Sequence, residues 1–207
     1  MDLQTSKNLG GVGALLLFIG PLLGFVPYVG VVGGLVGLVG FILVLVALKG
    51  FADRYNDAGI FNNALYGFIT TIVGIVSAFG AFLATALAVI ADLGIEDWTS
   101  ATEWTEVMTA ETALDSLLTL LGGVIIAVVI LFAFAILTAF LYRKSLGTLA
   151  SKSGVGLFGT AGLLLLIGAV LTIILIGFVL IWIAFLLVAI AFFSMKPTAV
   201  EPPPSPS

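Results

Sequence analysis

The strongest constraint in this sequence is a set of long apolar stretches that contain no Asp, Glu, Lys or Arg. They cover residues 9–48, 64–91, 117–141 and 157–195. A helix rises about 1.5 Å per residue and the hydrocarbon core of a bilayer is about 30 Å thick, so about 20 residues cross it once. The two middle stretches therefore fit single spans. Each outer stretch would be roughly 60 Å long as one helix and fits two spans.

Glycine and proline indicate where the outer stretches turn. In PLLGFVPYVG (residues 21–30), prolines remove backbone donors and break a helix, so we predict spans at about 9–25 and 29–48. The last stretch lacks proline, and we place its turn at TIILIG, which gives spans at about 157–171 and 177–195. The predicted fold is an all-α polytopic transmembrane helix bundle, residues 1–196, with six spans arranged as three helical hairpins.

Weak internal similarity bears on this hairpin arrangement. GVGALLLFIG (11–20) resembles GTAGLLLLIG (159–168), and AGIFNNA (58–64) resembles VGLFGTA (155–161). Three parallel hairpin repeats would explain these matches. Shared Gly- and Leu-rich composition would explain them as well, and the sequence leaves both explanations open.

Composition excludes several classes of protein. Hydrophobic residues make up 61% of the chain and charged residues only 9%, whereas about 25% of a soluble domain is charged. This composition and a net charge of -4 exclude a soluble enzyme and a nucleic-acid binder. The chain has no Cys and no His, so the usual thiolate and imidazole ligands are missing. We expect no catalytic residue, no metal site and no cofactor, and therefore not an enzyme.

The basic residues predict the orientation of the chain. With six spans, every Lys and Arg falls on one side: Lys7, Lys49, Arg54, Arg143, Lys144, Lys152 and Lys196. The acidic loop at residues 92–116 falls on the other side. Because basic residues stay cytoplasmic, we predict a multi-pass protein of the cytoplasmic membrane with both termini inside. Residues 197–207 are rich in proline and are expected to form a disordered cytoplasmic tail.

Glycines recur at helical spacing within two of the predicted spans. The second span has Gly30, Gly33, Gly37 and Gly40 on one face, and the third has Gly67 and Gly74. Small residues let helices approach closely in lipid, so these are candidate helix-packing positions. These glycines either pack against another helix of the same chain, which we favour, or form an interface with a second copy or line a narrow pore.

Charged residues of both signs flank the predicted spans on the cytoplasmic side. Two predicted inner loops, 51–63 and 142–156, carry Asp53, Arg54, Asp57, Arg143, Lys144 and Lys152. Opposite charges at the same depth could join two hairpins as an electrostatic staple. Alternatively, the basic residues contact lipid headgroups, which is worth about 1 kcal/mol for each Lys or Arg. We favour the staple.

The predicted outer loop contains the pattern of a short helix. Ser100 and Glu103 have the spacing of a capping box, and the apolar residues that follow have helical periodicity. We therefore expect a short amphipathic helix at the outer surface. Aromatic residues concentrate at membrane interfaces, which makes Trp98 and Trp104 candidate outer-interface residues.

Three segments carry a family resemblance: SKNLGGVGALL, LKGFADRYNDAGIFNNALYGFI and LASKSGVGLFGTAGLLLLIGAVLTIILIGF. The sequence resembles an archaeal membrane-protein family catalogued as domain of unknown function 996. The resemblance covers nearly the whole chain apart from the acidic loop and the proline-rich tail. It implies an archaeal polytopic membrane protein without an established activity, and it transfers no catalytic or binding residue.

The apolar stretches contain no ionisable side chain of the kind found in proton relays and charged-substrate sites. This favours a non-enzymatic scaffold, assembly factor or accessory subunit whose spans bind other spans. The alternative is a channel or facilitator for a small neutral solute or ion, using backbone carbonyls and hydroxyls. The expected partners are the lipid bilayer, other membrane proteins or a second copy of the chain, with no nucleic acid.

Overall fold

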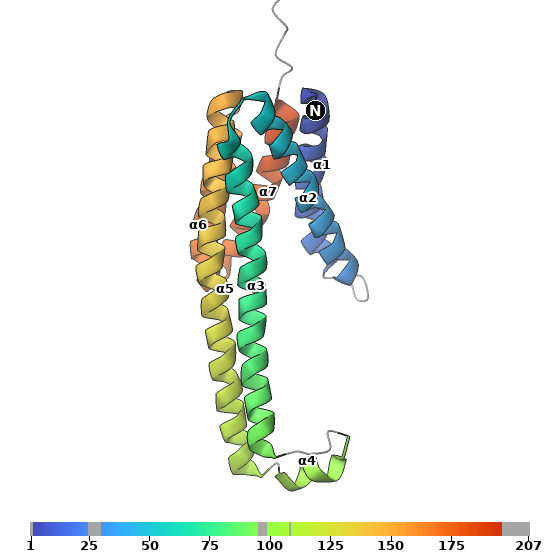
Figure 1. Cartoon of the computed structure of the whole chain (residues 1–207), viewed down its shortest axis with the longest axis vertical. Coiled ribbons are helices and arrows are strands. Elements are labelled where there is room, and N and C mark those ends of the chain that lie inside the picture. Colours follow the sequence, from blue (N-terminus) through green and yellow to red (C-terminus); the bar gives the residue numbers. More distant parts are fainter. Residues whose placement is uncertain (1, 25–29, 95–98, 108, 196–207) are drawn as a thin grey trace, which may run out of the picture. The chain divides into compact units, whose positions relative to one another are not determined.

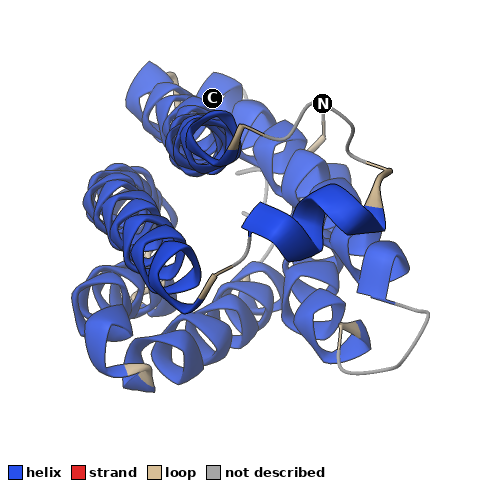
Figure 2. Ribbon diagram, turned by 90° about the horizontal axis from the view of Figure 1, so that it is seen from below, coloured by secondary structure: helices blue, strands red, loops and turns tan. Residues whose placement is uncertain are grey.

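The computed structural model describes residues 2–24, 30–94, 99–107 and 109–195, which fold into helices without a strand (Figure 1, Figure 2). The helices are α1 (Leu3–Leu23), α2 (Gly30–Arg54), α3 (Ala58–Leu93), α4 (Ala101–Val107), α5 (Ala110–Ser153), α6 (Leu157–Leu171) and α7 (Ile176–Ser194). A short 3-10 helix, η1 (Thr172–Ile174), joins the last two. The predicted tail at 197–207 lies outside the described residues, as do Trp98 and Lys196.

The predicted all-α class is confirmed. Within the described ranges, six helices are long and apolar enough to cross a membrane: α1, α2, α3, α5, α6 continued through η1, and α7. The short helix expected between the two central spans is present as α4.

Several helices extend well beyond the predicted spans. The predictions of loops at 51–63 and 142–156 are wrong over most of their length, because α2 continues to Arg54, α3 begins at Ala58 and α5 continues to Ser153. Leu146 and Leu149 are buried on the α5 extension while Arg143 and Lys144 are exposed. The extension is therefore amphipathic, and burial of its apolar side stabilises the helix after the charge-free stretch has ended.

The chain folds into two compact units. Unit 1 comprises Met1–Gly67 and Ala139–Ser207. In this unit α1 packs against α2 and α7, and α7 packs against α6. Gly13 of α1 faces Gly40 of α2, and Gly20 faces Gly33. Residue numbers rise along α1 while those of the facing residues in α2 fall, so the two helices run antiparallel.

Unit 2 comprises Phe68–Thr138, from α3 and α5. The Thr71 and Thr138 hydroxyl oxygens lie 3.3 Å apart. Further along, Gly74 faces the Phe134 side chain, and the Thr85 side chain faces Gly123. These contacts pair the two helical segments in antiparallel orientation.

The chain turns between α6 and α7 inside the predicted segment, residues 172–177. Leu175 makes this turn with a left-handed backbone conformation, at φ 64°. Residues other than Gly are uncommon in this conformation. At Gly177, a Cβ would collide with the Gly168 carbonyl oxygen. Glycine at position 177 therefore allows the two helices to approach closely.

Candidate functional site

In unit 1, the exposed large apolar side chains end at a similar level on five helices. On each of these helices, one residue marks the boundary beyond which no described large apolar side chain is exposed. These boundary residues are Val12 in α1, Val46 in α2, Tyr66 in α3, Phe140 in α5 and Leu163 in α6. Among the described residues, the segments beyond these positions (2–11, 47–65 and 141–162) expose no large apolar side chain. We call these three segments the polar end.

Contacts between helices show that these positions lie at similar levels. The Phe41 ring of α2 lies 5.7 Å from the Tyr142 ring of α5, measured between centroids. Tyr142 in turn faces Gly67 of α3, and Gly162 of α6 faces the Arg143 backbone. The apolar exposure on these helices therefore ends within about two helical turns of a common level. Helix α7 keeps an exposed apolar residue as far as Phe193.

The best-packed core of unit 1 lies at this polar end. Phe51, Phe158 and Phe192 are fully buried. The Phe192 ring centroid lies 4.9 Å from that of Phe158 and 5.8 Å from that of Phe51. Burial of one such ring contributes roughly 1.5–3 kcal/mol. The polar end is thus organised as a water-soluble domain is, with aromatic side chains inside and charges outside.

Two polar contacts tie separate helices together at the same end. The buried Ser145 hydroxyl of α5 donates to the Ile60 carbonyl oxygen of α3 at 2.5 Å. The Lys7 ammonium of α1 donates to the Met195 carbonyl oxygen after α7 at 2.8 Å. A third contact lies further along these helices, where the Trp182 indole donates to the Phe18 carbonyl oxygen at 2.8 Å and stacks on its ring.

A tight turn joins α2 to α3 and positions several charged groups. Asn56 adopts φ 49°, a left-handed conformation that Asn tolerates better than most residues. The Asp57 carboxylate accepts a hydrogen bond from the Gly59 backbone N–H at 3.0 Å, which caps the start of α3. Partial burial raises the pKa of the neighbouring Tyr55 hydroxyl, and the Arg54 charge opposes this rise.

The structure brings together part of the predicted charge staple. The Asp57 carboxylate lies 3.6 Å from the Lys152 ammonium at the end of α5. Asp53 instead pairs with Lys49, one turn earlier on its own helix, at 2.6 Å. Exposed pairs of this kind contribute only about 0–1 kcal/mol. Within the described part of the chain, no acidic side chain forms an ion pair with Arg143 or Lys144.

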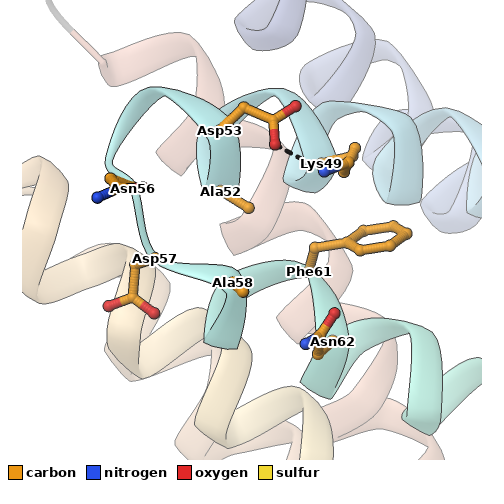
Figure 3. Close-up of a pocket in the computed structure, with 8 residues that line it drawn as sticks. All are labelled: Lys49, Ala52, Asp53, Asn56, Asp57, Ala58, Phe61 and Asn62. Atoms are coloured by element: carbon orange, nitrogen blue, oxygen red, sulfur yellow. Dashed lines mark hydrogen bonds and ion pairs between the residues drawn. The ribbon is translucent and has the colours of Figure 1, made fainter.

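A small pocket lies beside the turn (Figure 3). Its volume is about 230 Å³, and it is lined by Lys49, Ala52, Asp53, Asn56, Asp57, Ala58, Phe61 and Asn62. Lys49 and both carboxylates of this pocket already have the partners described above. Since ligand pockets measure about 300–1,000 Å³, we interpret it as a surface notch. Among the described residues, no group of three or more acidic side chains could hold a metal ion.

The structure places most of the predicted glycines against other helices of the chain. A Cβ at Gly33 or Gly40 would lie 2.7 or 2.6 Å from a backbone oxygen of α1. At Gly67 it would lie 3.1 Å from the Tyr142 ring, and at Gly74 2.6 Å from Phe134. At Gly37 a Cβ would meet nothing within 4 Å. The structure describes Gly30 as helical but does not describe its side-chain surroundings.

Trp104, the described member of the predicted outer pair, lies on α4. The Ser100 hydroxyl accepts a hydrogen bond from the Glu103 N–H at 3.3 Å, and the Ser100 carbonyl accepts one from the Trp104 N–H at 3.3 Å. The contact from Glu103 to the Ser100 hydroxyl belongs to the expected capping box and places Ser100 at the start of the helix.

The aromatic core and the α1 glycines are missing from the sequence-based site predictions. Gly13 and Gly20 are seven residues apart, as are their contact partners Gly33 and Gly40. This matched spacing was available in the sequence. No comparable signal marks Phe51, Phe158 and Phe192, because exposed phenylalanines also occur in several helices of the chain.

Six apolar helices, apolar side chains exposed along them and a polar end with a packed interior fit a multi-pass membrane protein. The chain belongs to the family described as protein of unknown function DUF996, whose model matches residues 36–186. This match confirms the resemblance seen in the sequence. An uncharacterised protein of Methanocaldococcus jannaschii is 29% identical over 199 residues, which cover 94% of each chain. No solved structure matches the chain.

Proposed function

We propose that this protein is a non-enzymatic scaffold or accessory subunit of the cytoplasmic membrane that binds other membrane-spanning helices. The observation that carries the proposal is the small share of the α3 and α5 spans that the chain itself covers. Of the most apolar 18-residue window in each helix, 17% is buried for α3 and 6% for α5, against 33% for each of the other four. Most of both helices is therefore available to lipid or to spans of a partner.

Three threonine hydroxyls of unit 2 support a scaffold over a channel. A channel needs hydroxyls or carbonyls that converge on a water-filled path. Thr71 and Thr138 pair with each other, and the Thr85 hydroxyl donates to the Ala81 carbonyl oxygen of its own helix at 3.0 Å. These hydroxyls are thus engaged within the helix pair.

The proposal includes an orientation, with the polar end and both termini in the cytoplasm. Its support is the charge distribution: Lys7, Lys49, Arg54, Arg143, Lys144 and Lys152 all belong to the polar end. Basic residues close to spans remain on the cytoplasmic side. Thr102 on α4 would then be external, and a single cysteine there should react with an impermeant thiol reagent in intact cells. Reaction only in inverted membrane vesicles would refute the orientation.

Site-directed photocrosslinking in native membranes tests the scaffold role. A photoreactive amino acid at Val129, which is 60% exposed on α5, should give one protein adduct of fixed mass. The same probe at Leu38, 48% exposed on α2, is the matched control for random collisions and should not give that adduct. Lipid adducts alone at Val129, with a monomer by native mass spectrometry and solute flux in liposomes, would refute the scaffold and establish the facilitator alternative.

A further inference from the structure

Arg143 and Lys144 are the adjacent pair among the basic residues of the polar end, and Arg54 shares their lack of a carboxylate partner within the described ranges. Both side chains of the pair are exposed, and within the described part of the chain neither is joined to a carboxylate. By contrast, Lys49 is held by Asp53, Lys152 lies beside Asp57, and Lys7 donates to a backbone carbonyl. Arg143 and Lys144 thus form an adjacent cationic pair to which none of the described carboxylates provides a counter-charge.

Their position along α5 places this pair next to the apolar boundary. Phe140 is the last exposed large apolar residue of the helix, so Arg143 and Lys144 begin about 5–6 Å beyond it. The headgroup layer on each side of a bilayer is itself about 5–8 Å thick. The Lys144 ammonium also lies 5.3 Å from the centre of the Phe140 ring, which holds the charge close to the boundary.

The helix surface just beyond the pair is open. Gly147 follows Arg143 by four residues and Lys144 by three, so all three lie on one side of α5. A Cβ at Gly147 would meet nothing within 4 Å. The missing side chain leaves open surface beside the two cations, about 10 Å beyond Phe140 and therefore at the outer edge of the headgroup layer.

We propose that Arg143, Lys144 and the open surface at Gly147 bind the headgroup of an anionic phospholipid in the adjacent leaflet. Arg143 provides planar donors that suit phosphate oxygens, and Lys144 provides a compact positive charge. Exposed cations at headgroup depth are attracted to anionic lipid without the loss of an internal ion pair. The site rests on the membrane placement in the proposed function but is independent of any protein partner.

Native mass spectrometry of the purified full-length chain tests this site. Phosphatidylglycerol is titrated against phosphatidylcholine, and wild type should retain the anionic lipid preferentially. Changing Arg143→Gln and Lys144→Gln together should weaken phosphatidylglycerol binding about 30-fold, from the usual contribution of two basic residues at a membrane surface. The matched control, Arg54→Gln with Lys152→Gln, removes the same charge about 12–18 Å beyond the boundary and should leave binding within about twofold.

A second variant tests the location without a change in charge. Gly147→Leu fills this open surface with a good helix former and should weaken phosphatidylglycerol binding several-fold. Wild-type affinity in this variant would overturn the site, as would equal losses in the two charge variants. If soluble glycerol phosphate displaces phosphatidylglycerol and binds with the same affinity as the lipid, the site is one for free phosphate. That result would also overturn the proposal. Because the titration contains no other protein, these results leave the crosslinking test of the scaffold unaffected.

Discussion

The contact between α1 and α2 gives a sharp test of how the glycines of this protein act. In Gly40→Ala, the new Cβ would lie 2.6 Å from the Gly13 carbonyl oxygen and 2.8 Å from the Leu16 Cβ. The nearest obstacle is backbone, which cannot rotate away, so the two helices must separate. Overpacking of this kind costs about 1–3 kcal/mol. Gly37→Ala is the matched control, because its Cβ would meet nothing within 4 Å.

The comparison isolates packing from helix propensity. Alanine favours the helix over glycine by about 1 kcal/mol at both positions, so this contribution cancels in the difference between the two variants. We therefore expect Gly40→Ala to be less stable than Gly37→Ala by about 1–3 kcal/mol. The measurement is the free energy of unfolding in mixed micelles titrated with sodium dodecyl sulfate. Equal stability of the two variants, or a Gly40→Ala protein more stable than wild type, would refute the reasoning.

Three further predictions concern the polar end. Ser145→Ala removes the donor to the Ile60 carbonyl oxygen and should cost about 1–3 kcal/mol in the same unfolding assay; a loss no larger than that of an exposed Ser151→Ala control would contradict it. Phe192→Ala empties the centre of the aromatic core and should cost about 3–5 kcal/mol, and a cost below about 1 kcal/mol would be inconsistent with a fully buried ring. The pKa of Asp2 is lowered by hydrogen bonds from the Thr5 backbone and side chain, so its stabilising contribution is present above the ordinary carboxyl pKa and is lost as the pH falls through the lowered value. Thermal unfolding across that range should show this acid-side decrease in wild type and a smaller one in Asp2→Asn, which caps without titrating; identical pH profiles would exclude the role of Asp2.

The number and approximate placement of the long helices followed from sequence where lipid is the solvent. A backbone in hydrocarbon must satisfy its own hydrogen bonds. The number of helices in a charge-free stretch can therefore be predicted from the length of that stretch alone. The same argument failed for residues 142–153. There the helix α5 is stabilised by tertiary burial of Leu146 and Leu149, and the appearance of charge marks the end of the apolar surface rather than the end of the helix.

The sequence alone thus determined the all-α class, the number of long apolar helices and the concentration of basic residues near one set of helix ends. Only the tertiary structure decided that a side chain at Gly40 would collide with α1 while one at Gly37 would meet nothing, and that Asp57 rather than Asp53 faces Lys152. The physical reason is that sequence spacing fixes which residues share a face of one helix. Which face meets which neighbour depends on the rotation and shift between helices, and the packing of side chains from distant parts of the chain sets both.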